Sequence, residues 1–259
     1  MKSNNCIIIA HRGESYDAPE NTLASINLAW ERNADAVEID VRLSKDNKIV
    51  VIHDENTKRI WGGNKSVRDQ TLRELKELNS GFYKNKEWEG EKIPVFSEVL
   101  ATVPPQKKLV VELKCGPEIV EILKEEIDSS GLKEEQIEII SFDISTVAKA
   151  KQVLPEHKVL LLSGLNSSFF GKLFPPSVDK LVTKVLGHKL DGLDVWAGNM
   201  IDEKFVQKIK SNGLKLYVWT VNDPEIAKKL RSFGVDGITT DRAQWLKEKI
   251  INRFNGLQN

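Results

Sequence analysis

The sequence has few metal-binding side chains of the Cys and His type, and it has no excess of charge of either sign. Two cysteines in 259 residues cannot form a disulfide framework, so we expect two reduced, mostly buried thiols. The four histidines are scattered, which argues against a zinc site of closely spaced Cys and His. Lys+Arg and Asp+Glu both number 38. No overall field therefore attracts nucleic acid or an anionic membrane, and any anion specificity must be local.

Long apolar runs are also missing. None approaches the roughly 20 residues of a membrane span, and polar residues follow the N-terminus too soon for a signal peptide. We therefore predict a soluble, cytoplasmic protein without a transmembrane segment. Its length of 259 residues with 40% hydrophobic residues suits one α/β barrel domain. The sequence sets no oligomeric state.

Short β-branched runs alternate with amphipathic segments along the whole chain, which predicts a parallel sheet buried on both faces. The predicted strands are Cys6–Ala10, Ala36–Asp40, Ile49–His53, Leu109–Lys114, Ile137–Ser141, Val159–Leu162, Gly192–Trp196, Leu216–Thr220 and Asp236–Thr240. The predicted helices are Thr22–Arg32, Pro117–Ser130, Asp143–Val153, Asp202–Ser211, Pro224–Phe233 and Arg242–Phe254, with Asp143, Asp202 and Asp223 as N-caps.

A closed β/α barrel has eight strands, one fewer than the nine runs. The link "VRLSKDNK" is too short for a parallel crossover, and residues 45–48 are a turn signal. Glu38–Ser44 and Ile49–His53 are therefore predicted to form an antiparallel hairpin. The remaining strands form one eight-stranded TIM-type β/α barrel over residues 1–259. Residues 54–94 are expected to be an inserted segment that caps the barrel mouth, with bracing of the barrel as the alternative role.

The hairpin also predicts which side chains share a face. A turn centred between Asp46 and Asn47 sets Asp40 opposite His53, so that Glu38, Asp40 and His53 point to one place. A slip of one residue would turn His53 away.

Three carboxylates stand where the active site of such a barrel lies, at the C-terminal strand ends. Glu38, Asp40 and Glu112 interrupt the apolar runs "AVEID" and "VVELK". Burying them unpaired is costly, and one hard divalent cation, Mg²⁺ or Ca²⁺, is the simplest compensation. The alternative is ion pairing to Arg12, Arg42 and Lys114. Three acids together favour the metal.

Two histidines, His11 and His53, end strands at the same place and can act as general acid and base. For either one alone a structural hydrogen bond is the alternative. We expect His157 and His188 to be surface residues. Arg12 offers a planar fork to a phosphate and Lys114 a point charge.

Aromatic residues follow three other strand ends. Phe142, Trp196 and Trp219 are candidates for the wall of a pocket that takes a glycerol or an alcohol head group. Packing under loops is the alternative for each of them.

Several stretches together resemble the glycerophosphodiester phosphodiesterase family, from the N-terminus to about Arg242. In chain order they read "IIAHRG", "PENTLASI", "AVEIDVRLSKDNKIVVIHD", "VVELK", "SFD", "YVWTVND" and "GVDGITTDR". The resemblance implies a phospholipase C-like phosphodiesterase barrel with an insertion after the His-Asp pair. No family motif covers Ser163–Val178.

The resemblance also implies roles for particular residues. A divalent cation would be held by Glu38, Asp40 and Glu112, and His11 and His53 match the acid/base pair. Arg12 and Lys114 match phosphate contacts, and Trp219 matches an aromatic near the glycerol pocket. Glu20 matches a further active-site position, where it would orient His11 or Arg12 or touch the metal.

Our main hypothesis is metal-dependent hydrolysis of a small-molecule glycerophosphodiester to glycerol 3-phosphate and an alcohol. The nucleophile, water or the glycerol 2-hydroxyl, stays open. A lysophospholipase D or phosphoinositide-type phosphodiesterase is the second hypothesis, with Phe169, Phe170 and Phe174 as an apolar surface. A phosphodiester-binding protein without catalysis is the third, and the histidine pair argues against it.

Overall fold

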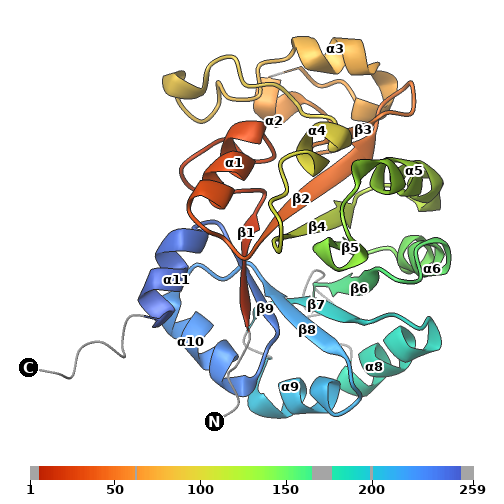
Figure 1. Cartoon of the computed structure of the whole chain (residues 1–259), viewed down its shortest axis with the longest axis vertical. Helices are drawn as coiled ribbons and strands as arrows, with labels where there is room; N and C mark the ends of the chain where they lie inside the picture. Colours follow the sequence, from red (N-terminus) through yellow and green to blue (C-terminus); the bar gives the residue numbers. More distant parts are fainter. Residues whose placement is uncertain (1–5, 62, 165–176, 199–200, 252–259) are drawn as a thin grey trace, which may run out of the picture.

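The fold is a closed barrel of parallel strands surrounded by helices (Figure 1). The computed structural model describes residues 6–61, 63–164, 177–198 and 201–251. Its nine-stranded sheet has the order β1-β9-β8-β7-β6-β5-β4-β2-β3, and the pairing of β1 with β2 closes all strands but β3 into a ring. This confirms the predicted eight-stranded barrel. The strands are β1 (Ile7–His11), β2 (Ala36–Leu43), β3 (Ile49–Val51), β4 (Lys108–Leu113), β5 (Ile137–Ser141), β6 (Lys158–Ser163), β7 (Gly192–Trp196), β8 (Lys215–Trp219) and β9 (Gly237–Thr240).

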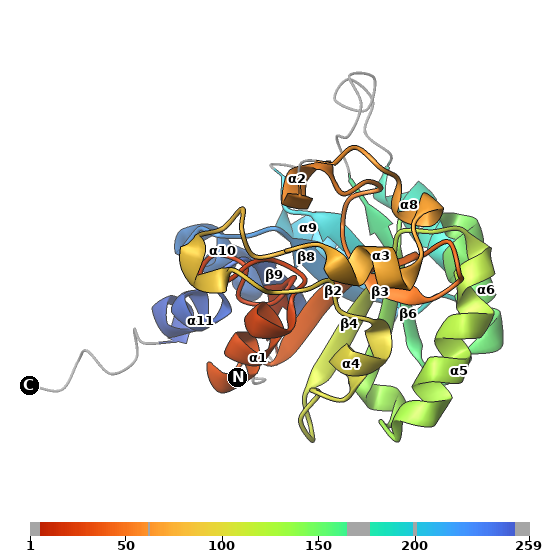
Figure 2. The ribbon, with the colours of Figure 1, turned by 90° about the horizontal axis from the view of Figure 1, so that it is seen from above.

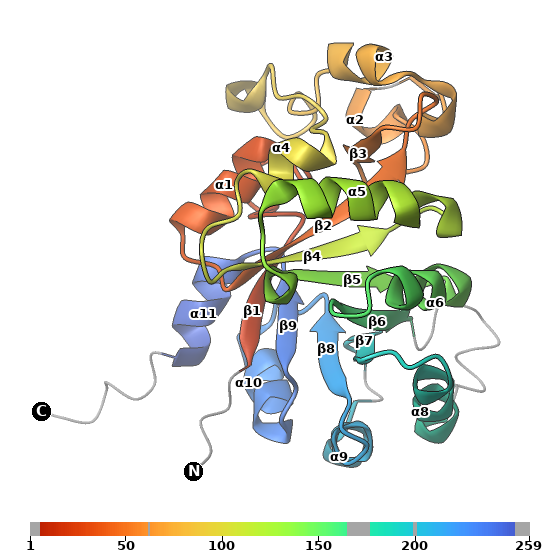
Figure 3. The same cartoon turned by 45° about the vertical axis from the view of Figure 1, so that its right-hand side comes forward.

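Helices follow the strands and cover the outside of the ring, as Figure 3 shows for α5, α6, α8 and α11. The α-helices outside the inserted segment are α1 (Leu23–Glu31), α4 (Phe96–Leu100), α5 (Val120–Ser130), α6 (Ile144–Val153), α8 (Val178–Gly187), α9 (Glu203–Lys210), α10 (Pro224–Phe233) and α11 (Ala243–Ile251), with short 3₁₀ turns η3 (Pro117–Ile119) and η4 (Glu134–Gln136). Asp143, Asp202 and Asp223 accept backbone N–H groups at their helix starts, which confirms them as N-caps. Helices α4 and α8 were not predicted. No helix in the described ranges is long and apolar enough to cross a membrane.

Alternation along the strands separates an inner from an outer apolar layer. Val37, Ile39 and Val41 of β2 pack in the large cluster between the strands and the helices. Because successive strand residues face opposite sides, Glu38 and Asp40 face the barrel interior. A smaller cluster inside the ring includes Ile140 and Leu162, so the interior is a packed core below the carboxylates.

The predicted hairpin exists, but its predicted register is wrong by one residue. Val41 pairs with Val51, and the N–H of Ile52 donates to the carbonyl of Asp40 at 2.9 Å. Ile52, and not His53, is therefore opposite Asp40. The cause is the loop: Ser44 N–H donates to the carbonyl of Lys48 at 2.9 Å, which leaves an odd loop, residues 45–47, with Asn47 in the left-handed region at φ 56°.

The inserted segment, residues 54–94, builds a small apolar cluster of its own with the end of the hairpin. It contains α2 (Lys58–Trp61), η1 (Val67–Asp69), α3 (Leu72–Glu77) and η2 (Lys86–Trp88). Ile60, Val67 and Leu75 pack with Val50 and Ile52, and α2 and α3 lie at the β3 end of the barrel (Figures 1 and 2). The Tyr83 hydroxyl accepts the N–H of Glu20 at 2.9 Å, which joins the segment to the loop after β1.

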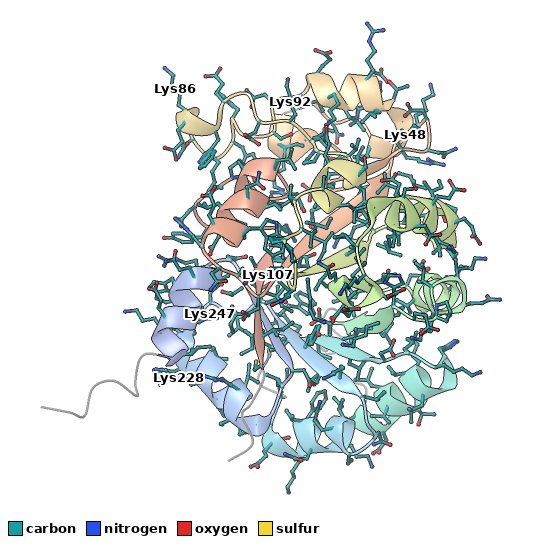
Figure 4. The ribbon with its side chains drawn as sticks, viewed as in Figure 1. Lys48, Lys86, Lys92, Lys107, Lys228 and Lys247 are labelled. Carbon is teal, nitrogen blue, oxygen red and sulfur yellow. The ribbon has the colours of Figure 1, made fainter. Side chains whose placement is uncertain are left out.

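At the N-terminal end of the barrel, polar groups are held by local partners. Lys107 and Lys247, labelled in Figure 4, donate to the turn before β2: Lys107 to Oδ1 of Asn33 at 2.6 Å and Lys247 to Oδ1 of Asp35 at 2.6 Å. His157 is buried, and its Nδ1 lies 3.3 Å from the carbonyl of Ile137. The prediction of a surface position for His157 is therefore wrong, because the residue directly precedes β6 and packs against the start of β5.

Both cysteines are free and half-buried. Burial raises the pKa of the Cys6 thiol to about 12 and that of the Cys115 thiol above its usual value. Because the thiolate is the reactive form, these raised pKa values disfavour reaction of either thiol at neutral pH.

Candidate active site

The chain leaves β1 through a left-handed turn that presents His11 and Arg12 at the C-terminal end of the barrel. Arg12 has φ 57° and Gly13 φ 83°. A Cβ on Gly13 would lie 2.5 Å from the carbonyl carbon of Ser25, so only glycine fits there. The N–H of Arg12 donates to Oε2 of Glu38 at 3.0 Å, and the Ser25 hydroxyl donates to the carbonyl of Arg12 at 2.9 Å. These bonds fix the turn against β2 and α1.

A cavity of about 270 Å³ opens at this end of the barrel. It is lined by His11, Arg12, Glu38, His53, Glu112, Lys114, Ile140, Phe142, Leu162, Asp194, Trp219 and Thr239. Most of the predicted site residues are in this set. Asp40 lies just behind the lining, in contact with Arg12 and Lys114, and Glu20 lies beside Arg12. His53 reaches the cavity despite the shifted register because β3 ends at Val51, so strand alternation no longer fixes its direction.

Three buried carboxylates gather on one side of the cavity. Glu38, Asp40 and Glu112 are 3%, 0% and 8% exposed, and each offers an oxygen within 4.8 Å of the others. Burial, then the charges of Asp40 and Glu112, raises the pKa of Glu38 well above its usual value. Burial and Asp40 raise the pKa of Glu112 to about 7. Burial acts the same way on Asp40, but Arg12 and Lys114 outweigh it and hold its pKa well below the usual range.

Two cations lie against these acids. Nε of Arg12 is 3.0 Å from Oδ2 of Asp40, and Nζ of Lys114 is 2.6 Å from Oε1 of Glu112 and 3.2 Å from Oδ1 of Asp40. The ion pairs considered as the alternative to a metal are therefore present for Arg12 and Lys114. Arg42 instead donates to the carbonyls of His53 at 2.9 Å and Lys114 at 3.4 Å.

The ion pairs do not satisfy the carboxylates. Oδ1 of Asp40 and Oε1 of Glu112 have no partner with hydrogen-bond geometry among the described residues, although Lys114 is within ion-pair distance of both. If all three carboxylates are ionised, Arg12 and Lys114 leave one negative charge uncompensated in a buried place, which is costly. An all-oxygen donor set of this kind fits Mg²⁺ or Ca²⁺. The oxygens of Glu38, Asp40 and Glu112 thus suit the binding of one divalent cation.

Asn21 holds Asp40 in place, a contact that sequence reasoning missed. Its Nδ2 donates to Oδ2 of Asp40 at 2.8 Å, and its Oδ1 accepts the N–H of Asp40 at 3.1 Å. Asn21 has φ 57°, which asparagine tolerates better than most residues. The signal was the "PENT" stretch, in which only Glu20 was singled out.

Each candidate catalytic histidine has a carboxylate on Nδ1. Nδ1 of His11 is 2.7 Å from Oδ1 of Asp241, and Nδ1 of His53 is 2.7 Å from Oδ1 of Asp54. A carboxylate only accepts hydrogen bonds, so the proton of a neutral imidazole sits on Nδ1 and Nε2 is left bare. No role was predicted from the sequence for Asp54 or Asp241.

The two carboxylates differ in their own partners. Asp241 accepts from neutral donors, Nδ2 of Asn222 at 2.6 Å and the Ser15 hydroxyl at 3.3 Å. Asp54 is paired with a cation, Nε of Arg59, at 2.7 Å. Burial raises the pKa of Asp54, but Arg59 and His53 have the larger, opposite effect and bring it down to about 2. Burial, with Arg12 and Lys114, lowers the pKa of His53 against the pull of Asp40.

Glu20 joins two arginines. Its Oε1 accepts from Nη1 of Arg12 at 2.8 Å, and both its oxygens accept from Arg59 at 2.7 and 2.8 Å. Burial raises the pKa of Glu20, but the two arginines outweigh it and lower the pKa. Of the contacts considered for Glu20, the one with Arg12 is present.

Two aromatic residues form one wall of the cavity. The rings of Phe142 and Trp219 meet edge to face, with centroids 5.7 Å apart at 88°, and Nζ of Lys114 lies 6.0 Å from the centroid of Phe142. Trp196 is 40% exposed and is not among the lining residues.

A model of the glycerophosphoryl diester phosphodiesterase family matches residues 11–244. The chain belongs to this family. It is similar to a glycerophosphodiester phosphodiesterase of Caldanaerobacter subterraneus, with 35% identity over 93% of this chain and 96% of the relative. An Oleispira antarctica phosphodiesterase, solved with the product sn-glycerol-3-phosphate, has a TM-score of 0.83 and 30% identity, covering 94% of this chain and 96% of the other. The glycerophosphodiester phosphodiesterase of Thermotoga maritima has a TM-score of 0.76 and 31% identity over 94% and 97% of the two chains.

These matches confirm the resemblance read from the motifs and make the chain an enzyme of the glycerophosphodiester phosphodiesterase class. Phe169, Phe170 and Phe174, the apolar surface expected of a lipid-acting member, lie in 165–176, outside the described residues.

Proposed function

We propose that this family member hydrolyses glycerophosphodiesters to glycerol 3-phosphate and an alcohol, with one divalent cation, Mg²⁺ or Ca²⁺, and with His11 and His53 as the acid/base pair. The observation that carries the proposal is the arrangement of the histidines. Both have Nδ1 fixed by a carboxylate at 2.7 Å. Both also line the cavity that contains Glu38, Glu112 and the positively charged side chains of Arg12 and Lys114.

The substrate phosphate would bind between the cations and the carboxylate cluster. Arg12 and Lys114 both line the cavity, and their charges offset the negative charge of a phosphodiester and the further charge that develops in the transition state. A divalent cation held by Glu38, Asp40 and Glu112 would supply Lewis-acid stabilisation of the phosphoryl oxygens. Glu20 orients the guanidinium of Arg12 through Nη1.

The two histidines would transfer the protons. One takes the proton of the attacking oxygen, either water or the glycerol 2-hydroxyl, on its bare Nε2. The other gives a proton to the alcohol oxygen as its bond to phosphorus breaks. If the 2-hydroxyl attacks, the roles reverse while water opens the cyclic phosphate.

The carboxylate partners suggest which histidine has which role. Asp241 accepts hydrogen bonds from neutral donors, so its negative charge is available to stabilise an imidazolium at His11. This suits a general acid. Asp54 is already paired with Arg59 and the pKa of His53 is lowered, which suits a base that starts neutral. We also propose that residues 54–94 border the cavity mouth, since Arg59 and Tyr83 from this segment contact Glu20.

A substrate panel tests this function. The purified protein is incubated with glycerophosphocholine, glycerophosphoethanolamine or lysophosphatidylcholine in the presence of Mg²⁺ or Ca²⁺, and glycerol 3-phosphate, free choline and lysophosphatidic acid are measured. We expect equal amounts of glycerol 3-phosphate and choline from glycerophosphocholine, and slower turnover of the lysolipid. Release of phosphocholine and glycerol, or turnover of the lysolipid alone, would contradict the proposal.

A further inference from the structure

Asp194 is a buried acid inside the barrel whose role is not explained by the chemistry above. It lies on β7, opposite Leu162 of β6 and Tyr217 of β8, which both belong to the inner apolar layer. The residue is 2% exposed, yet it is part of the cavity lining. Its side chain thus faces the cavity from an apolar surrounding.

One oxygen of the Asp194 carboxyl group, Oδ1, lacks a hydrogen-bond partner within the described part of the chain. The other deep acid of the barrel, Glu138, is satisfied: it accepts from the Tyr217 hydroxyl at 2.7 Å and from Lys108. Burial, with Glu112 and Glu138, raises the pKa of Asp194. A buried polar group without a partner costs stability, so a ligand is the natural source of the missing donor.

Asp194 lies across the cavity from the phosphate side. β7 is four strands from β2 in either direction round the ring, through β4, β5 and β6 or through β1, β9 and β8. Glu38 is therefore on the opposite wall. Between the two walls the lining is apolar or aromatic, with Ile140, Leu162 and Trp219. The indole N–H of Trp219 points to the carbonyl of Asp194 at 3.4 Å, which holds the ring beside this acid.

A ligand held at its phosphate by Arg12 and Lys114 would extend its carbon chain along this apolar wall. The group that arrives at Asp194 must be able to form a hydrogen bond, because the unpartnered Oδ1 gains nothing from an apolar end. A trimethylammonium group has no N–H to donate, whereas glycerol has two free hydroxyls. Thr239, on β9 at the other side of Trp219, adds a hydroxyl to the same lining.

We propose that Asp194 accepts hydrogen bonds from the hydroxyl groups of the substrate's glycerol arm and selects this arm over alkyl groups without hydroxyls. The proposal rests on the proposed function, because it takes the phosphate to bind at Arg12 and Lys114. It makes Asp194 a specificity-determining residue whose carboxyl group is a stability cost to the unliganded fold.

Equilibrium binding tests the selectivity without turnover. Glycerol 3-phosphate, propyl phosphate and phosphocholine are titrated by calorimetry into the wild type, Asp194→Asn and Asp194→Ala in the presence of Mg²⁺. Hydrogen bonds to an acid of this kind are worth on the order of 10- to 100-fold in affinity, so the wild type should prefer glycerol 3-phosphate over propyl phosphate by about that factor. Asp194→Ala should lose the preference, and Asp194→Asn, which keeps one acceptor, should retain part of it.

Thermal unfolding of the unliganded proteins provides a second readout, with Glu138→Gln as the matched control. Asp194→Asn should raise Tm, because it removes a buried acid whose Oδ1 has no partner among the described residues. Glu138→Gln should lower Tm, because it weakens the hydrogen bonds that Glu138 accepts from Tyr217 and Lys108. It should leave the ligand preference unchanged. The proposal would be overturned if Asp194→Ala kept the preference for glycerol 3-phosphate, or if Asp194→Asn had a lower Tm than the wild type. It would also be overturned if Asp194→Ala lost affinity for phosphocholine alone. Wild-type protein that leaves glycerophosphocholine intact would instead overturn the proposed function.

Discussion

Arg59 binds Glu20 through both ends of its guanidinium group, with Nη1 at 2.8 Å from Oε2 and Nη2 at 2.7 Å from Oε1. Its Nε donates to Asp54 at 2.7 Å, and Asp54 holds Nδ1 of His53. Glu20 in turn binds Arg12. One arginine of the inserted segment therefore connects a proposed catalytic histidine with a proposed phosphate ligand.

Replacing this arginine should impair the reaction through His53. In Arg59→Met, Asp54 loses its cation and holds an imidazolium more strongly, so the pKa of His53 rises. The acidic limb of the kcat/KM profile against pH should move to higher pH, and kcat should fall by about 10- to 100-fold, as for other residues that orient a site ligand. Arg59→Lys, which keeps the charge without the planar fork, should lie between wild type and Arg59→Met. A pH profile that is identical in all three proteins would contradict this role.

Removing either histidine should abolish most turnover. His11→Ala and His53→Ala each delete a proton donor or acceptor, and we expect kcat to drop about 10²- to 10⁴-fold. Tm should stay near the wild-type value, because both side chains are partly exposed. The control is His188→Ala, which changes an exposed histidine outside the cavity and should leave kcat unchanged. Near-normal turnover in either site variant would refute the acid/base assignment.

Asn21 should contribute to metal affinity although it is not a proposed ligand. Asn21→Gly removes the amide that fixes Asp40, while glycine keeps the left-handed backbone at φ 57°. The affinity for Mg²⁺ or Ca²⁺, measured by calorimetry, should fall about 10- to 100-fold. Asn33→Gly is the matched control, since Asn33 has φ 59° at the opposite end of the barrel. Equal metal affinity in the two variants would show that the hydrogen bond from Asn21 to Asp40 is not needed for metal binding.

Metal binding should strengthen with pH, because the cation competes with protons for the same oxygens. In the metal-free protein the pKa of Glu112 is raised to about 7 and that of Glu38 is raised well above its usual value. A raised carboxyl pKa stabilises the fold below the unfolded-state pKa, and this contribution is lost as the pH rises through the folded-state value. The metal-free Tm should therefore fall as the pH rises from about 4.5 to about 7.

The gain in Tm on adding Mg²⁺ or Ca²⁺ should grow over the same pH range. Scanning fluorimetry at the two pH values, with and without cation, measures both effects. Glu112→Gln should reduce the pH dependence, because the amide does not titrate. A gain that is the same at both pH values would argue against a cation at these carboxylates.

The sequence predicted the barrel well because its signals are local. Runs such as Val159–Leu162 are buried and appear as continuous apolar stretches, and Asp143, Asp202 and Asp223 mark helix starts by their own chemistry. The register of the hairpin was not determined in the same way. "KDNK" suits several turn types, and only the left-handed backbone of Asn47 makes the loop odd and shifts His53 by one position.

The sequence predicted the residues that contribute directly to the candidate site. It missed residues that act on the site through another residue. Glu38, Asp40 and Glu112 interrupt apolar strands and so stand out. Arg59 pairs with Glu20 across 39 positions, from a segment without regular periodicity. Asp194 lies within the predicted strand Gly192–Trp196, and only the packed barrel reveals that its Oδ1 has no partner among the described residues.

The central claim is that the carboxylate cluster serves phosphodiester hydrolysis by holding a divalent cation. Its most direct test is glycerol 3-phosphate release from glycerophosphocholine by protein stripped with EDTA, before and after Mg²⁺ or Ca²⁺ is added back. The account predicts no release from the stripped protein, recovery with one of the two cations, and little recovery in Glu112→Gln. Full turnover by the stripped protein in excess EDTA would contradict it.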